Sequence, residues 1–150
     1  MATSALVAFL HFLAEVVVLA TLFLEWQTMS PAPTLGEAKR MQRCDRWYGL
    51  FAVLLLVVGF LRVFYFEKGS KFYFSNPVFD AKLALFALVG IVSIYPTVRF
   101  IRWGPQTRRG EAPTLSPAEH ARIMLSLRLE MLLLLGTALC ASFMARGIGL

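Results

Sequence analysis

The chain has 150 residues, of which 58% are hydrophobic, and its formal net charge at neutral pH is +6. A typical soluble domain is only about 45–50% apolar, so this composition favours an integral membrane protein. The positive charge does not indicate a nucleic-acid partner, because the Lys and Arg residues gather in short connections between apolar runs, where membrane topology explains them. Composition therefore predicts a single domain whose main partner is the lipid bilayer.

Four apolar runs are long enough to cross a bilayer, which requires about 20 helical residues per span. They predict an all-α, integral membrane four-helix bundle that forms one domain over residues 1–150. Both basic connections lie on one side of this bundle, and the positive-inside rule makes that side cytoplasmic and leaves both termini outside. We expect a multi-pass protein of the bacterial cytoplasmic (inner) membrane. The expected spans are residues 4–24, 47–66, 78–101 and 123–144.

Short motifs mark where the helices begin. Residues 34–37 and 116–119 fit the S/T-x-x-E capping box, in which two side chains satisfy backbone donors of the first turn. Asn76, followed by a proline, predicts a third start. The Gly- and Pro-containing stretch 104–113 is expected to be a loop.

Polar side chains occur well inside three of the predicted spans. A rise of about 1.5 Å per residue places His11, Arg62 and Lys82 at similar depths near the outer side, each on a different helix. Glu15 lies one turn below His11 on the same helix face. Because polar groups turn inward in lipid, we expect these four side chains to face one another.

This group of side chains would suit a b-type haem. The neutral imidazole of His11 and a deprotonated Lys82 amine would be the axial metal ligands. Arg62 and Lys68 would neutralise the propionates, and Glu15 would hold the imidazole tautomer or relay protons. The leading hypothesis is therefore a haem-binding membrane protein engaged in electron transfer or a membrane-linked oxidation.

Simpler interpretations of the same residues remain open. His11 could make only an interhelical hydrogen bond, and Lys82 could extend to the headgroups. The alternative function is a cofactor-free membrane helper or permeation protein with a buried His/Glu/Lys/Arg cluster. A copper site has less support, because no Met or Cys ligands cluster with His11, and no nucleophile-and-base constellation assigns an enzyme class. A homodimer or a redox partner is compatible with so small a bundle.

Other polar and aromatic residues are expected to serve the membrane interface or the packing. Glu25, Trp26 and Trp103 are predicted to be interfacial anchors. Glu130 shares a helix face with Thr137, and we expect it to pair with an Arg on the inner side.

Short segments spread along the chain carry a family resemblance. They are DRWYG at 45–49, RVFYFEKG at 62–69, NPVFDAKLALF at 76–86, SIYPT at 93–97 and MARG at 144–147. In these segments the chain resembles a family of small predicted bacterial membrane proteins of unknown function. The resemblance implies a four-helix membrane protein and no particular activity.

A second, more distant resemblance rests on FLHFL at 9–13 and AKLAL at 81–85. These segments look like the copper-resistance-D-like membrane proteins and the haem-b protoporphyrinogen oxidase family, in which a His of the first helix and a Lys that opens a later helix serve haem. RLE at 128–130 is similar to an Arg and a Glu near the start of the last helix in that group. The resemblance implies that His11 and Lys82 ligate haem b.

Overall fold

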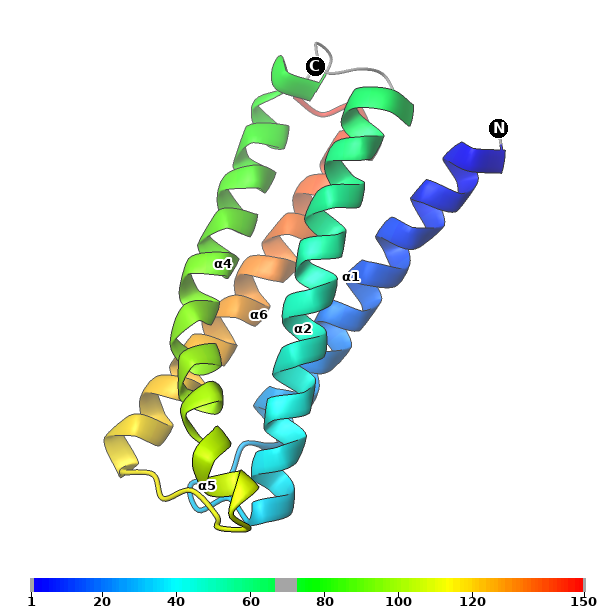
Figure 1. Cartoon of the computed structure of the whole chain (residues 1–150). Coiled ribbons are helices and arrows are strands. Elements are labelled where there is room, and N and C mark those ends of the chain that lie inside the picture. Colours follow the sequence, from blue (N-terminus) through cyan, green and yellow to red (C-terminus); the bar gives the residue numbers. More distant parts are fainter. Residues whose placement is uncertain (1, 67–72, 150) are drawn as a thin grey trace.

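The computed structural model describes residues 2–66 and 73–149, and it is a helical bundle (Figure 1). Four of its helical stretches are long and apolar enough to cross a membrane, which confirms the predicted all-α membrane bundle. The five-residue α5 lies in the stretch predicted to be a loop, and the turn η1 is π-helical, which the sequence did not indicate. The elements are α1 (Ala2–Thr28), α2 (Leu35–Leu61), η1 (Arg62–Phe66), α4 (Pro77–Arg102), α5 (Gly104–Arg108) and α6 (Pro117–Ala145).

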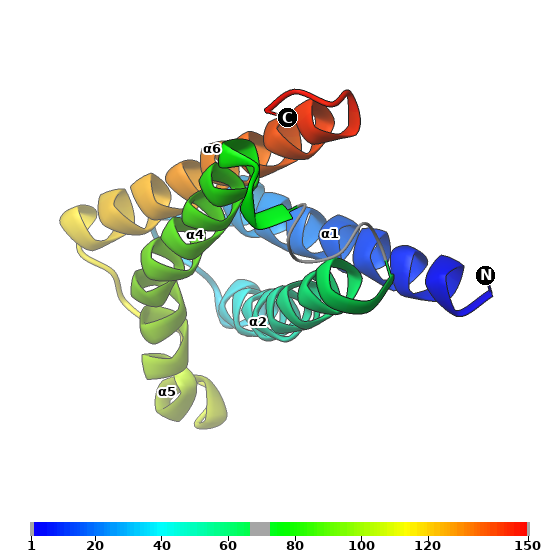
Figure 2. The same ribbon diagram turned by 90° about the horizontal axis from the view of Figure 1, so that it is seen from above.

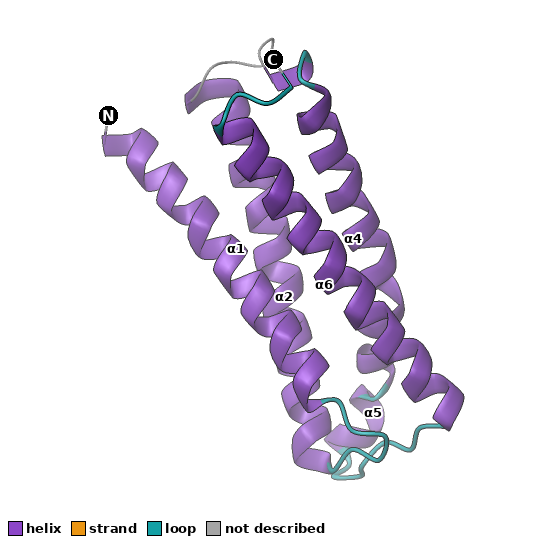
Figure 3. Cartoon of the chain, turned by 180° about the vertical axis from the view of Figure 1, so that it is seen from behind, coloured by secondary structure: helices purple, strands orange, loops and turns teal. Residues whose placement is uncertain are grey.

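The helices form two closely packed pairs. α1 packs mainly against α2, and α4 packs mainly against α6, while contacts of α1 with α6 and of α2 with α4 join the pairs. Both termini lie at one end of the bundle, here called the terminal end, and α5 lies at the other, here called the α5 end (Figure 1). α1 leans away from α4 as it approaches the terminal end, as the views from above and from behind also show (Figures 2 and 3). The bundle is therefore tighter at the α5 end.

The predicted caps at the α5 end are present. Thr34 Oγ1 accepts a hydrogen bond from the Glu37 backbone N–H (3.3 Å), and the Glu37 carboxylate accepts one from the Thr34 N–H (2.7 Å), so both halves of the capping box form. Ser116 Oγ likewise accepts from the Glu119 N–H (3.1 Å). The Glu119 carboxylate lies 3.4 Å from the Arg99 guanidinium, so it links α6 to α4.

A third cap lies at the terminal end, where it also holds the end of α6. Asn76 Oδ1 accepts a hydrogen bond from the Val78 N–H (2.9 Å), which confirms the predicted start of α4. Asn76 is almost fully buried, and its Nδ2 lies 3.5 Å from the carbonyl oxygen of Ile148. Gly147 has a positive φ of 77°, which lets the chain turn back after α6 toward this site.

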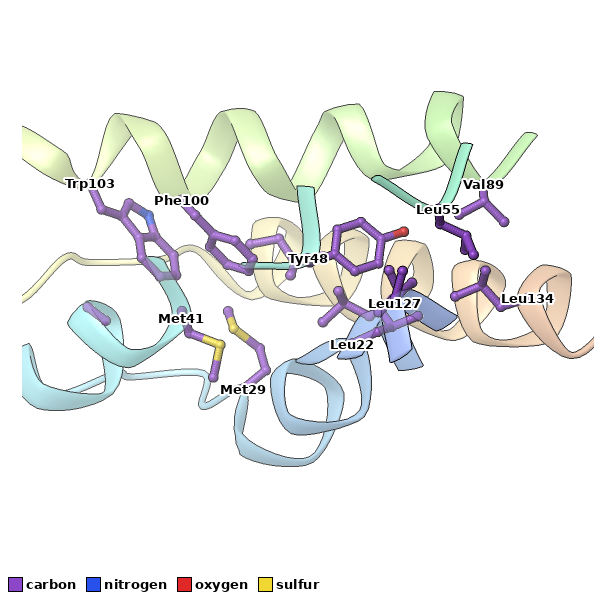
Figure 4. Packing of buried hydrophobic residues seen from close by; sticks show 14 residues of the cluster. Leu22, Met29, Met41, Tyr48, Leu55, Val89, Phe100, Trp103, Leu127 and Leu134 are labelled. Carbon is purple, nitrogen blue, oxygen red and sulfur yellow. The ribbon is translucent and has the colours of Figure 1, made fainter. Parts of the chain in front are cut away.

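The interior holds a core of large side chains that is densest toward the α5 end. Leu22, Leu127 and Tyr48 are almost completely buried there, beside the aromatic pair Phe100 and Trp103 (Figure 4). The rings of that pair meet edge to face with centroids 5.0 Å apart. Trp103 is only 5% exposed, so its expected role as an interfacial anchor is wrong. The helix ends beyond the apolar span, and the indole turns inward onto Phe100 instead.

The outer surface of the bundle is strongly apolar. Large hydrophobic side chains such as Val16, Leu50, Ile91 and Leu132 are well exposed, one from each of the four long helices. In water such a surface would promote aggregation, whereas in a bilayer it faces hydrocarbon at no cost. The exposed apolar side chains thus match the four helices that are long enough to span a membrane.

Candidate functional site

A cavity of about 610 Å³ opens between the helices in the half of the bundle nearer the terminal end. Its lining includes residues of α1 and α4, the two helices that diverge toward the terminal end. All four long helices line it, with mostly apolar side chains. The lining residues include His11, Phe12, Glu15, Leu55, Gly59, Phe60, Arg62, Phe79, Lys82, Leu83, Phe86, Leu134, Thr137, Ala138, Ala141 and Ser142.

Small residues on α6 explain why space remains at this level. Beyond Leu134, the cavity-facing side of α6 carries Thr137, Ala138, Ala141 and Ser142. None of these side chains is large enough to reach across the bundle, so the void between α6 and α1 stays unfilled. Toward the α5 end the lining of α6 stops at Leu134, and the turns beyond it carry the fully buried Leu127.

The structure brings four of the five predicted site residues to this one cavity. His11 and Glu15 come from α1, Arg62 from η1 and Lys82 from α4. Lys68, the fifth, lies outside the described residues. The inward helix faces identified from the sequence therefore meet as expected, although the assignment of these residues to haem stays a prediction.

The His11 imidazole fits into a niche left by Gly59 on α2. A Cβ atom at Gly59 would lie 3.3 Å from His11 Cε1 and 3.7 Å from Nδ1, so the ring edge rests almost on the α2 backbone. Nδ1 is buried and has no hydrogen-bond partner among the described residues. One nitrogen of the ring thus faces protein without a polar contact, and such a buried group calls for an explanation.

Positive groups surround the imidazole. Lys82 and Arg62 both lie within electrostatic range of His11. The Arg62 guanidinium also lies over the Phe12 ring, with its central carbon 5.6 Å from the ring centroid, in cation–π geometry. Three nitrogen-bearing side chains from three elements therefore make this part of an otherwise apolar cavity attractive to an acidic group.

A second set of polar residues, which the sequence analysis did not assign to a site, lies toward the α5 end. Glu25, Asp45 and Glu130 are 2%, 7% and 1% exposed, and Tyr48 is 4% exposed. The three carboxyl groups lie within electrostatic range of one another and of Tyr48, and Tyr48 lies beside the Glu130 carboxyl. These four residues are called the acid cluster below.

The acid cluster corrects two expectations. Glu25 is not an interfacial anchor, because α1 continues to Thr28 and carries its carboxyl inward below Leu22. Glu130 does not pair with an inner-side Arg, because among the described residues its neighbours are Tyr48 and Asp45. The sequence does contain a sign of this burial, because Glu25 shares the inward face of α1 with His11. Its position near the end of the apolar run predicts the membrane interface instead.

Metal-binding chemistry has limited support in the part of the chain that the structure describes. No group of three or more His, Cys, Asp or Glu side chains there is placed to hold a metal ion. A metal in the cavity would thus depend on His11 together with Lys82.

The comparisons with known proteins give a family and no activity. A family described as "Predicted membrane protein (DUF2214)" matches residues 3–149. No curated protein and no solved structure matches the chain.

Proposed function

Since the chain belongs to the DUF2214 family of predicted membrane proteins, whose description names no activity, we propose from the cavity alone that it binds a largely apolar ligand with an acidic group inside the membrane. The specific ligand that we propose is b-type haem. The observation that carries the proposal is the convergence of His11, Arg62 and Lys82 in a single apolar cavity.

The size and lining of the cavity support binding of a small molecule. Its volume of about 610 Å³ falls within the range of roughly 300–1,000 Å³ that is usual for ligand pockets. Such pockets combine apolar walls with a few polar groups that fix the orientation of the ligand. Here Phe12, Leu55 and Phe86 supply walls, and the nitrogen-bearing side chains supply the polar groups.

Haem b is a flat apolar group with two propionates, and the residues present fit it in kind. His11 and Lys82 would be the axial ligands, and Arg62, with Lys68, would neutralise the propionates. Glu15 lines the same cavity one turn from His11, where it would hold a tautomer or accept a proton. When bound, haem would supply one-electron redox chemistry, as electron transfer or a membrane-linked oxidation requires.

The location that we propose is the bacterial cytoplasmic membrane with the α5 end inside. Basic residues concentrate near that end, including Lys39, Arg43, Arg102 and Arg108. This distribution follows the positive-inside rule and leaves both termini outside.

The test compares the two histidines of the chain, His11 and His120. The protein is produced with haem supplied, purified in mild detergent, and its oxidised and dithionite-reduced visible spectra are recorded together with iron content. We expect a stoichiometric Soret band that shifts on reduction, is lost in His11→Ala and is retained in His120→Ala, which alters the only other imidazole. A colourless, folded wild-type protein would overturn the haem assignment.

The broader proposal has its own test, which does not depend on colour. Organic extracts of the purified protein are analysed by mass spectrometry for co-purified molecules. An acidic apolar compound that is present in the wild type and depleted in Arg62→Gln would support the binding role without haem. Extracts that contain only bulk phospholipid, in wild type and variant alike, would overturn it.

A second function is favoured by one further observation. A cleft of about 440 Å³ at the α5 end is lined in part by Asp45, so the bundle has hollows toward both of its ends. A permeation protein would have this arrangement. A permeation protein would tolerate Lys82→Arg. A guanidinium cannot ligate iron, so haem that is retained in the Lys82→Arg variant would exclude Lys82 as an axial ligand.

A further inference from the structure

The acid cluster is the feature that the cavity does not explain. It lies on the far side of Leu22 and Leu55 from His11, toward the α5 end, and none of its members lines the cavity. Its carboxyl groups come from three different helices: Glu25 from α1, Asp45 from α2 and Glu130 from α6. Its existence thus depends on the assembled bundle.

Some buried oxygens of the cluster lack a hydrogen bond to the described protein. Glu25 Oε1 and Glu130 Oε1 are shielded from solvent and have no hydrogen-bond partner among the described residues. Tyr48 Oη lies beside the Glu130 carboxyl without a hydrogen bond of good geometry. The Tyr48 ring lies among Leu22, Leu55 and Leu127 (Figure 4). Leu55 also lines the cavity, so it lies between the cavity and the cluster. An unpartnered buried oxygen is costly, so each of these oxygens calls for a physical explanation.

The polar neighbours from α2 and α4 form no ion pair with these carboxyl groups among the described residues. α4 contributes Thr97, whose hydroxyl donates to Asp45 Oδ1 at 2.6 Å. α2 contributes the Cys44 thiol, which lies near both Glu25 and Asp45, while Arg40 and Arg43 lie near Cys44. Within the described chain, the ion pairs involve Arg99 with Glu119 and Arg109 with Glu111, and none includes the cluster.

A proton is the species that would satisfy these oxygens. The donors within the described residues are not grouped closely enough to hold a metal ion. An ionised carboxylate buried without a partner is strongly disfavoured, and in practice such a group takes up a proton. A proton neutralises each carboxyl and also provides an O–H donor for the neighbouring unpartnered oxygens.

A route for protons is visible on one side. The cleft at the α5 end is lined by Asp45 together with Gln42, Thr107 and Arg108. Thr107 Oγ1 lies 3.2 Å from Gln42 Oε1, and Gln42 Nε2 donates to the Phe100 carbonyl at 2.8 Å, so polar groups hold the wall of this cleft. Asp45 is shared by the cleft and the cluster, and it is the residue that connects them.

We propose that the acid cluster is a proton-binding site within the membrane, loaded from the α5 end through the cleft by way of Asp45. Each uptake takes one proton from water in the cleft and converts one carboxylate into a neutral carboxylic acid. Glu25 and Glu130 hold the protons, Tyr48 orients them, and Asp45 passes them inward. This inference does not depend on what the cavity binds.

Infrared spectroscopy tests the proposal on the full chain in lipid nanodiscs at neutral pH. The carbonyl stretch of a protonated carboxylic acid is separate from that of a carboxylate and shifts in D₂O. We expect such bands in the wild type, one lost in Glu25→Gln and another in Glu130→Gln. Glu119→Gln, which changes a partly exposed acid on α6, should leave them unchanged, and so should His11→Ala.

Three results of these infrared measurements would contradict the proton-binding site or its route. A folded wild type without protonated-acid bands at neutral pH would overturn the proposal, and this measurement needs no variant. Bands that vanish when choline chloride is replaced by sodium chloride would also overturn it in favour of a cation site. Asp45→Asn should slow deuterium exchange of the bands several-fold, and an unchanged exchange rate would overturn the assigned route.

Discussion

At the terminal end the four long helices enclose a cavity of about 610 Å³ with nitrogen-bearing side chains, whereas toward the α5 end the same helices bury carboxyl groups in close packing. One face of α1 contributes to both regions, through His11 and then through Glu25. The residues opposite make the difference: Gly59 and Ala141 leave space, while Tyr48 and Leu127 fill it. The function of an inward polar group in this bundle is therefore decided by the size of its neighbours as much as by its own charge.

The largest expected effect is the loss of a core side chain at the tight end. Leu127 is fully buried, so Leu127→Ala should lower the free energy of unfolding by about 2–5 kcal/mol, as large-to-small core changes do. Leu83→Ala enlarges the existing cavity and should cost much less. Unfolding of both variants by SDS in mixed micelles, followed by circular dichroism, measures the difference, and equal losses would show that the two ends are packed alike.

Removal of the hydroxyl that supports the acid cluster should have the next largest effect. Thr97→Val deletes the 2.6 Å hydrogen bond to Asp45 and leaves that buried carboxyl without its donor, at a cost of about 1–3 kcal/mol. Thr21→Val is the matched control, because the Thr21 hydroxyl bonds only to carbonyls of its own helix. If the two variants unfold at the same SDS fraction, the link between α4 and the cluster contributes nothing.

Helix caps at the two ends should differ in their contribution. Asn76→Ala removes a buried cap that also contacts Ile148, and it should approach the upper limit of about 2 kcal/mol for cap losses. Thr34→Ala removes an exposed cap and should cost about half as much. The apparent melting temperature in detergent provides the comparison, and a larger loss for Thr34→Ala would contradict this view of the terminal end.

The smallest effect on stability, and the most specific for the cavity, concerns two glycines of α2. Gly49→Ala has open space around it and should stabilise the helix by about 0.5–1 kcal/mol. Gly59→Ala should gain less, because its methyl group would press on His11 Cε1 at 3.3 Å. We expect ligand retention after purification to fall in Gly59→Ala alone, and equal retention would show that the niche for the imidazole does not matter.

Much of the fold and part of the site followed from the sequence. Helix length, the capping motifs and the inward stripes of α1, α2 and α4 predicted which side chains would meet, and His11, Glu15, Arg62 and Lys82 do line one cavity. These patterns are local and repeat with the helix period, so a single sequence contains them.

The acid cluster could not be predicted in the same way. Glu130 was expected to have a cationic partner, but whether an Arg side chain reaches it depends on the tilt and rotation of the neighbouring helices. The positions of Glu25 and Trp103 near the ends of apolar runs predict that they lie at the membrane interface. In the structure both side chains are buried inside the bundle. The α5 end is thus the part of the bundle where tertiary packing overrides positional rules.

The pairing of α1 with α2 and of α4 with α6 has a consequence for how the protein assembles. Each pair is consecutive in the sequence, so each can enter the bilayer as a hairpin and associate before the other pair is present. The cavity and the acid cluster both use residues from the two hairpins, so neither exists until the hairpins meet. A molecule or proton held between them would therefore favour their association, and the occupied protein should resist dissociation of the halves better than the empty one.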